Sequence, residues 1–408
     1  MTPSVSVSRF SAAIAATLLC FSACTQTADF KVLQPLGDRA SAVEQGAGLP
    51  KGFYVPSTVD TVRWGDLPNA DAKPVLTVPS GSAVTFDTVS HEGMLEDQGK
   101  DPARYFAQFG VKPEHVLNDA RALASSSLKH DFVKDGPHII TGPVAVQGAK
   151  AGDVLKVEVL ALQFRVPYGV ISNRHGKGAL PGEFPETTAP EAGADAAHPD
   201  RYHNISMFVP IEQSGGKWYG TLKAGEGMTA RFALQPFNGT LGVAVNTKDK
   251  ANSIPPGAYA GNLDLNYLTT GATLYVPIQV DGALFYAGDP HFVQGHGEVA
   301  LTAVEGSLRA SYRLTLLKAD DASLPMRPLK NPFAENADYW IAIGLNADLN
   351  EAMKDAVRQS IQFLNQKLGF DRAGAMAYAS AAVDFEVTQV VDRVKGVNAM
   401  IRKADFPR

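Results

Sequence analysis

Short runs in which apolar and polar residues alternate occupy the middle of the chain. Every second residue is apolar over most of 153–160 and throughout 310–318. A period of two places these apolar residues on one face of an extended chain, so both runs are predicted to be half-buried strands. By the same criterion further strands are predicted over 76–78 and 84–86, from 139 onward, and over 205–211, 229–234, 274–280, 283–287 and 297–304.

The pattern becomes helical near residue 345, and the whole part 345–408 is predicted to be helical. Asp348 and Glu351 have the spacing of a capping box, and Gly369 follows the apolar run where a helix would end. Asp371 is predicted to cap a second helix. The apolar stripes of the two helices are predicted to be core residues: Met353, Val357, Ile361, Leu364 and Leu368 in the first, and Met376, Ala379 and Val383 in the second.

Frequent Gly and Pro, 37 and 26 residues, favour many short strands joined by turns. The predicted fold class is α+β and β-rich, with sandwich- or barrel-like strand layers and C-terminal helices packed against them. The segment 169–199 is rich in Gly, Pro and Ala and is predicted to be a long irregular loop. Such loops in compact domains often serve function.

The N-terminus has the pattern of a secretory signal peptide, predicted for residues 1–24. Arg9 precedes the apolar run 10–21, and the small residues Ser22 and Ala23 follow. The segment ending at Cys24 resembles a bacterial lipobox, so simple cleavage and lipidation of Cys24 stand as alternatives. Residues 25–50 are predicted to be a linker and 51–408 the folded region. The protein is thus expected to be exported to the periplasm, either free or held by a lipid anchor.

Composition narrows the chemistry. The chain of 408 residues carries a net charge of −5, and such a balance offers no basic face for nucleic acid, so no nucleic-acid partner is predicted. The two cysteines, Cys20 and Cys24, both lie in the leader. The mature region therefore has neither a cysteine nucleophile nor a disulfide.

Polar residues in pairs two apart mark the segment 257–306 as the candidate site. Asn262 and Asp264 form one pair, and Asp289 and His291 the other. Residues i and i+2 of an extended chain point to the same side, so each pair can chelate one ion. The ligand set suits zinc or another divalent ion, with calcium as an alternative. Turn hydrogen bonds and an ordinary loop histidine are the competing interpretation.

Other polar residues could complete such a site. Glu298 follows seven residues after His291 and could take a proton from a metal-bound water. Gln294 could contact a bound ligand or make a structural hydrogen bond. His91, in the sequence DTVSHEG, and His138 could approach the site, or they could be a solvated turn residue and a buried hydrogen-bonded histidine.

Three motifs in this region resemble the acetamidase/formamidase family. They are PPGAYAGNLD at 255–264, GALFYAGDPHFVQGHGEV at 282–299 and TAVE at 302–305. HIITGPV at 138–144 with GAKAGDVLKVEVL at 148–160 resembles the family's strand pair, and VTQVVDRVKGVNAMI at 387–401 resembles its terminal helix. The resemblance covers roughly residues 75–403.

The resemblance implies metal-dependent hydrolysis of small carboxylic amides, such as formamide or acetamide, to carboxylate and ammonia. It implies ligand roles for Asp264, Asp289 and His291, with Asn262 as a further ligand. Glu298 is then the expected general base and Gln294 an expected contact of the amide. A homo-oligomer is also implied.

The sequence departs from the family pattern at two positions. Ala260 stands where many relatives have glycine, and His296 replaces the usual aspartate. Together with the long insert at 169–204, these departures keep two alternatives open. One is an exported metal hydrolase for a different or larger amide, and the other is a non-catalytic binding protein on the same fold.

Overall fold

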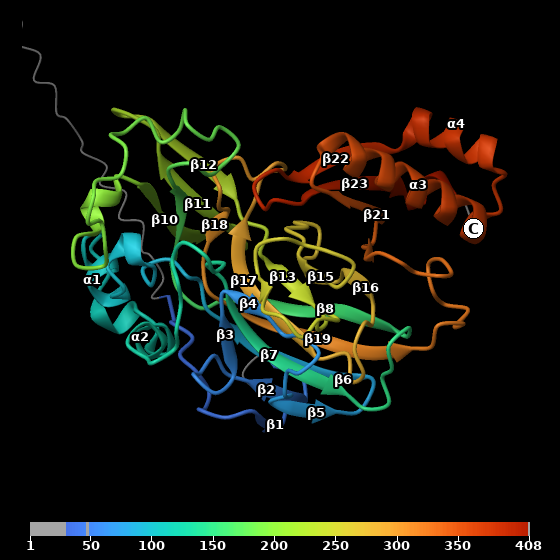
Figure 1. Cartoon of the computed structure of the whole chain (residues 1–408), viewed down its shortest axis with the longest axis horizontal. Coiled ribbons are helices and arrows are strands. Elements are labelled where there is room, and N and C mark those ends of the chain that lie inside the picture. The colour runs from blue at the N-terminus through green and yellow to red at the C-terminus, as the bar shows by residue number, and fades with distance from the viewer. Residues whose placement is uncertain (1–29, 46–48, 407–408) are drawn as a thin grey trace, which may run out of the picture.

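A computed structural model of the protein describes residues 30–45 and 49–406, so the predicted leader lies outside the described residues. Two large sheets dominate the structure (Figure 1). The first has ten strands in the spatial order β1 (Ser41–Val43), β2 (Gly52–Val55), β6 (Ser82–Thr88), β19 (Leu308–Leu317), β8 (Val154–Phe164), β16 (Thr273–Pro277), β20 (Phe333–Glu335), β21 (Tyr339–Asn346), β23 (Lys395–Arg402) and β22 (Asp384–Gln389).

The second large sheet has eleven strands. Eight of them follow the order β12 (Thr229–Ala233), β11 (Lys217–Lys223), β10 (Ile205–Ser214), β9 (Tyr168–Asn173), β18 (Val304–Glu305), β17 (Phe285–Val293), β13 (Phe237–Gly242) and β15 (Ala260–Asn262). β7 (Ile139–Val146) also pairs with β17, and it pairs with β3 (Val62–Trp64) and β5 (Leu76–Val78). A two-stranded sheet joins β4 (Asp66–Leu67) to β14 (Ala251–Asn252).

The described helices are short except at the C-terminal end. The α-helices are α1 (Pro102–Ala107), α2 (Asn118–Ala124), α3 (Leu349–Leu368) and α4 (Arg372–Ala382). The 3-10 helices are η1 (Glu96–Gln98), η2 (Pro113–His115), η3 (Pro199–Tyr202) and η4 (Lys403–Asp405). None of the helices in the described ranges has both the length and the apolar character that crossing a membrane would require.

The two large sheets pack face to face over one apolar core. Phe86 and Tyr312 come from the ten-stranded sheet and Phe285 from the other, and all three side chains are fully buried. The ring of Phe285 lies edge-on to both, with centroids 5.6 and 5.7 Å away. Aromatic rings in this arrangement add stability beyond the area that they bury. The prediction of a β-rich α+β fold with sandwich-like layers is confirmed.

The predicted helix caps are present at the C-terminal end, where α3 and α4 pack against strands β20 to β23. The carboxylate of Asp348 accepts a hydrogen bond from the Glu351 amide at 3.0 Å, and the helix ends at Gly369 with φ 75°. The predicted core stripe is only partly right, because Met353 and Met376 are 37% and 53% exposed. The face of α3 that is buried instead carries Ala352, Ala356, Phe363 and Leu364.

The prediction of a helical part over 345–408 is correct for α3 and α4 but wrong beyond them. Residues 387–401, expected as a terminal helix, form most of the hairpin β22–β23, which extends the ten-stranded sheet beside β21. Val387 lies opposite Val397 in this hairpin, and β-branched residues pack well on a pleated surface. Likewise, only residue 304 of the strand predicted over 297–304 belongs to a β-strand, because β18 spans Val304–Glu305.

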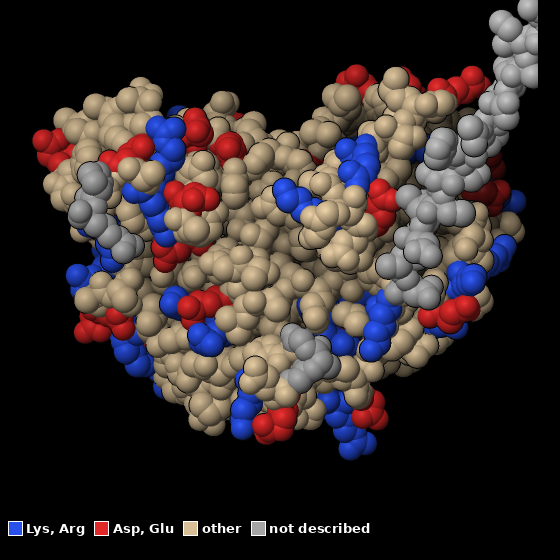
Figure 2. Space-filling model, turned by 180° about the vertical axis from the view of Figure 1, so that it is seen from behind, with Lys and Arg blue, Asp and Glu red and all other residues tan. Residues whose placement is uncertain are grey.

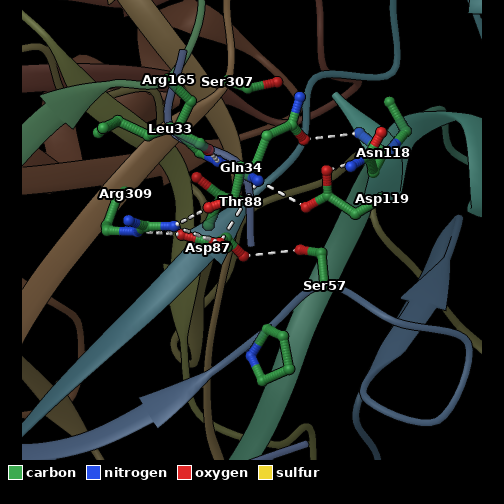
Figure 3. Close-up of polar contacts among 12 residues, drawn as sticks. Leu33, Gln34, Ser57, Asp87, Thr88, Asn118, Asp119, Arg165, Ser307 and Arg309 are labelled. Atoms are coloured by element: carbon green, nitrogen blue, oxygen red, sulfur yellow. Dashed lines mark hydrogen bonds and ion pairs between the residues drawn. The ribbon is translucent and has the colours of Figure 1, made fainter. Parts of the chain in front are cut away.

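The range 25–50, predicted to be a linker, is built into the fold in its described part. β1 pairs with β2, and the main-chain oxygens of Leu33 and Gln34 accept hydrogen bonds from Arg165 and Arg309 at 2.9 and 2.8 Å (Figure 3). A segment of small polar residues suggests a linker. Its main-chain oxygens can nevertheless accept hydrogen bonds from buried arginines, because every residue carries a carbonyl group. The prediction is therefore wrong for these residues.

Arg165 lies at the centre of this buried network. Its guanidinium is 2.8 Å from a carboxylate oxygen of Asp119 and 3.4 Å from one of Asp87, and Arg309 also binds Asp87 at 2.6 Å. The side chain of Arg165 is completely buried. Removing a charge from such a network leaves its partners buried without compensation.

Arg165→Met is expected to lower the free energy of unfolding by about 3–5 kcal/mol, because Asp119 loses its partner in a dry environment. Urea unfolding of the mature protein measures the loss. The control is Arg358→Met, which breaks an exposed pair with Asp355 on α3 and should cost less than about 1 kcal/mol. Equal losses in the two variants would contradict a stabilising role of the network.

Candidate active site

Three neighbouring strands bring the two predicted pairs together. β13 lies between β15 and β17, the strands that carry or precede the paired residues (Figure 1). In the resulting cluster Nε2 of His291 is 3.3 Å from Asp289 and Nδ1 is 3.8 Å from Asp264. Single ligand atoms of these three residues all lie within 4.8 Å of one another. The i, i+2 spacing therefore does place donors on a common side.

Close packing of the backbone makes this cluster possible. A Cβ atom at Gly239, in β13, would lie 2.4 Å from a carboxylate oxygen of Asp264 and 2.6 Å from one of Asp289. Three of the acids have a left-handed backbone, with φ of 51° at Asp264, 53° at Asp289 and 47° at Glu298. Such conformations cost about 1–3 kcal/mol each and concentrate at functional sites.

Four further residues that the sequence left unassigned complete the cluster. Glu305 lies opposite His291 across the β17–β18 pair, with its carboxylate 3.0 Å from Nε2. His91 groups with Asp289 and Glu305, and Asp392 groups with Asp264 and Glu298. His138 places Nε2 3.7 Å from Asp289. Glu305 ends the TAVE motif and was therefore visible in the sequence, whereas Asp392 lay in a predicted helix.

Crowded carboxylates shift their pKa values in opposite directions. Burial, reinforced by the charge of Asp289, raises the pKa of Asp264 to about 7. Burial and the charge of Asp264 raise the pKa values of Glu298 and Asp392 well above their ordinary range. Burial alone would raise the pKa of Asp289 too, but the neighbouring imidazoles, His138 first, outweigh it and hold this pKa low. The cluster thus carries more acids than its imidazoles can neutralise.

Unpartnered donors indicate that a cation fits here. Several atoms are buried and have no hydrogen-bond partner among the described residues: both carboxylate oxygens of Asp264, Nδ1 of His291, Oε2 of Glu305 and Oδ2 of Asp392. Buried charges are stable when they are paired or coordinate a metal. Carboxylate oxygens mixed with imidazole nitrogens suit zinc or a similar divalent ion.

The cluster forms one wall of a cavity of about 290 Å³. Asn262, Asp289, His291 and Glu298 line the cavity, while Asp264 lies behind them. Loop residues between 174 and 181 line it as well, so the predicted long loop does lie at the site. Figure 2 shows the molecule from the side opposite to Figure 1. On this face acidic and basic side chains are interspersed, and a notch separates two projecting lobes.

Two predicted site residues have other roles in the structure. Gln294 is not in the cavity wall; its amide nitrogen donates to the main-chain oxygens of Asp264 and Thr388 at 3.0 and 3.3 Å, so its role is structural. Asn262 does line the cavity, but its side-chain oxygen accepts a hydrogen bond from Thr240 at 2.5 Å. That bond competes with metal coordination, so Asn262 is better suited to hydrogen bonding than to ligation.

The two departures from the family pattern have structural explanations. His296 lies outside the cavity wall, 3.3 Å from Glu386 and with its ring against Tyr267, so it does not replace a donor of the cluster. Ala260 is buried with φ 66°, a conformation that glycine adopts without strain. The left-handed backbone at Ala260 is therefore strained in this chain, and a glycine at this position would adopt it without strain.

Acids and imidazoles that converge on a cavity, as they do in this β-rich sandwich, are the features expected of an active site. Residues 230–402 match the profile of the Acetamidase/Formamidase family. The chain is 27% identical over 293 residues to an acetamidase from Mycolicibacterium smegmatis, a match that covers 59% of this chain and 71% of the relative. It is 24% identical over 303 residues to a formamidase from Methylophilus methylotrophus, covering 62% and 73%.

Solved structures show the same fold. A structure of an acetamidase from Bacillus halodurans superposes with a TM-score of 0.64 at 22% identity, over 86% of this chain and 98% of the other. One from Yersinia enterocolitica also reaches 0.64, at 23% identity, over 89% and 96%. Residues 230–402 carry the profile of the acetamidase/formamidase family, and the relatives that match the chain support the family that its motifs predicted.

Proposed function

We propose that this protein hydrolyses carboxylic amides to a carboxylate and ammonia with a divalent metal ion held by the buried cluster. The observation that carries the proposal is the convergence of unpartnered carboxylate and imidazole donors on the cavity wall. The matching relatives assign the reaction class, hydrolysis of a carbon–nitrogen bond in linear amides.

The donors form two adjacent groups around His291. His91, Asp289 and Glu305 make one group, and Asp264 and Asp392 make the other, with Glu298 beside them and assigned to proton transfer. When bound, a divalent ion polarises an amide carbonyl and acidifies a water molecule. Zinc is the expected ion and calcium the alternative.

Glu298 and His138 contribute directly to the chemistry. Glu298 lines the cavity and is placed to accept a proton from the attacking water and pass it to the leaving nitrogen, which departs as ammonia. Burial lowers the pKa of His138 to about 4, so its ring is neutral at pH 7. The Ser253 hydroxyl lies 2.9 Å from Nδ1 and fixes the ring, leaving Nε2 toward the cluster for ligation or hydrogen bonding.

Removal of the metal should abolish ammonia release. Without a cation, the acids around Asp264 repel one another and bind protons. The experiment dialyses the purified mature protein against a chelator, counts bound ions by mass spectrometry and assays ammonia before and after zinc is restored. Full activity in protein that contains less than about a tenth of an ion per site would contradict metal dependence.

A non-catalytic binding protein on the same fold is the second candidate. It would bind metal yet release no ammonia from any amide. Export to the periplasm, the alternative of a lipid anchor at Cys24, and assembly as a homo-oligomer stay predictions.

A further inference from the structure

The cavity is too large for the shortest amides alone. Its volume of about 290 Å³ is near the lower end of the range, roughly 300–1,000 Å³, found for pockets that enclose drug-sized ligands. Formamide and acetamide, small molecules of three and four heavy atoms, would leave most of this space unfilled. A substrate that fills the cavity must extend away from the acid cluster.

Apolar side chains form part of the cavity wall. Phe132 and Pro181 line it from two different loops, and Leu301 and Val391 contribute from the segments after Glu298 and before Asp392. Apolar walls offer a contact for methylene groups and little for water. They therefore suit an aliphatic chain between the reacting amide and a second polar group.

Two cations stand at the cavity without an acid partner. Lys177 and Arg393 both line it, the first from the loop after β9 and the second from the β22–β23 turn. Within the ranges 30–45 and 49–406, no carboxylate lies within 4.0 Å of either side chain. Partial desolvation and the charge of Arg174 lower the pKa of Lys177, and Arg393 adds to this effect. The positive charges of Lys177 and Arg393 therefore lie at the cavity without a carboxylate to neutralise them.

Two other charged side chains of the cavity wall outside the acid cluster, Arg174 and Asp135, already have partners. Arg174 binds the carboxylates of Glu92 and Asp97 at 3.1 and 2.7 Å. Asp135, an acid that lines the cavity, is 2.6 Å from the ammonium of Lys250. Lys177 and Arg393 are therefore available to an anionic ligand that shares the cavity with the acid cluster.

We propose that the preferred substrates are amides whose far end carries a carboxylate, such as monoamides of aliphatic dicarboxylic acids, with the carboxylate bound by Lys177 and Arg393. The proposal rests on the proposed amide hydrolysis and names its substrate class. The amide end lies at the acid cluster, the methylene chain lies against the apolar wall, and hydrolysis releases ammonia and a dicarboxylate.

A paired substrate series tests the proposal. The monoamides of succinic, glutaric and adipic acid are compared with butanamide, pentanamide and hexanamide, which match them in carbon number. The kcat/KM of the best acidic amide should exceed that of its neutral partner by about tenfold or more, as hydrogen bonds to charged groups allow. The advantage should shrink as salt is added, since Lys177 is open to solvent.

Variants of the two cavity cations test whether they cause the preference for acidic amides. Lys177→Gln and Arg393→Gln should each lower kcat/KM for the acidic amide about tenfold, mainly through KM, and leave the neutral amide unchanged. Arg358→Gln, on α3 and outside the cavity, is the matched loss of charge and should change neither value. Equal kcat/KM for acidic and neutral amides, or an acidic preference that survives both cavity variants, would overturn the proposal.

Binding separates this proposal from the proposed function. Calorimetry with the Glu298→Gln protein should show tighter binding of the acidic amide than of its neutral partner, and Lys177→Gln should remove the difference. If no amide releases ammonia while this preference is present, amide hydrolysis fails and the anion site stands. If ammonia is released without any preference, hydrolysis stands and the anion site fails.

Discussion

Asp289→Asn is expected to lower kcat/KM by about a thousandfold or more while the chain stays folded. The Asp289 carboxylate belongs to two groups of candidate ligands and lies 3.3 Å from His291. A metal ion contributes several kcal/mol to the stabilisation of a transition state, and each 1.4 kcal/mol or so is tenfold in rate. Asparagine keeps the shape of the side chain and tolerates φ 53°, which alanine would adopt under strain.

Ammonia release, metal content and circular dichroism together measure this effect. The variant should lose bound metal along with activity and keep its β-rich spectrum. Asp281→Asn is the control, because that carboxylate is exposed and pairs with Lys150 at the surface. A fully active Asp289→Asn protein would rule out the assigned metal site.

Glu298→Gln is expected to lower kcat by about 10²–10⁴-fold with little change in KM, the range that a positioned general base contributes. Glutamine has nearly the same shape but cannot take the proton of the attacking water. The other donors around His291 would still hold metal, so metal content should fall far less than in Asp289→Asn.

Steady-state rates of ammonia release at saturating amide isolate the effect on kcat. Glu386→Gln is the control. The carboxylate of Glu386 contacts His296, in the same motif as Glu298, but Glu386 is not part of the cavity wall. It should leave kcat unchanged. A rise in KM at normal kcat in Glu298→Gln would instead assign Glu298 to substrate binding.

Local patterns in the sequence predicted much of the fold. All but the last residue of the alternating run 310–318 lies in β19, and all but the first residue of the run 153–160 lies in β8, because each strand turns one face to the core between the sheets. The cap at Asp348 was visible because it depends on residues three apart. The paired donors were visible for the same reason, since i, i+2 spacing in an extended chain needs no tertiary information.

The predictions were wrong where contacts with residues distant in the sequence determine the local structure. Residues 387–401 have apolar positions that fit a helix nearly as well as a strand, and β21 makes them a strand by offering an open edge. Gln294 and His296 lie in the same motif as Glu298, but neither reaches the cavity, because irregular backbone after β17 turns their side chains toward other partners. The motif at 282–299 predicts which residues lie near the site, but it does not predict which of their side chains point into the cavity.

The sequence by itself predicted the family and the strand-rich class, and it singled out Asp264, Asp289 and His291, which the structure brings together. Only the tertiary structure decided the composition of the cluster, because His91, Glu305 and Asp392 reach it from separate parts of the chain. It also decided the charge of the cavity: Arg174 and Lys177 are three residues apart, and one is neutralised by buried acids while the other is not. Electrostatic effects depend on distance in space and on exclusion of water, and neither is encoded by spacing along the chain.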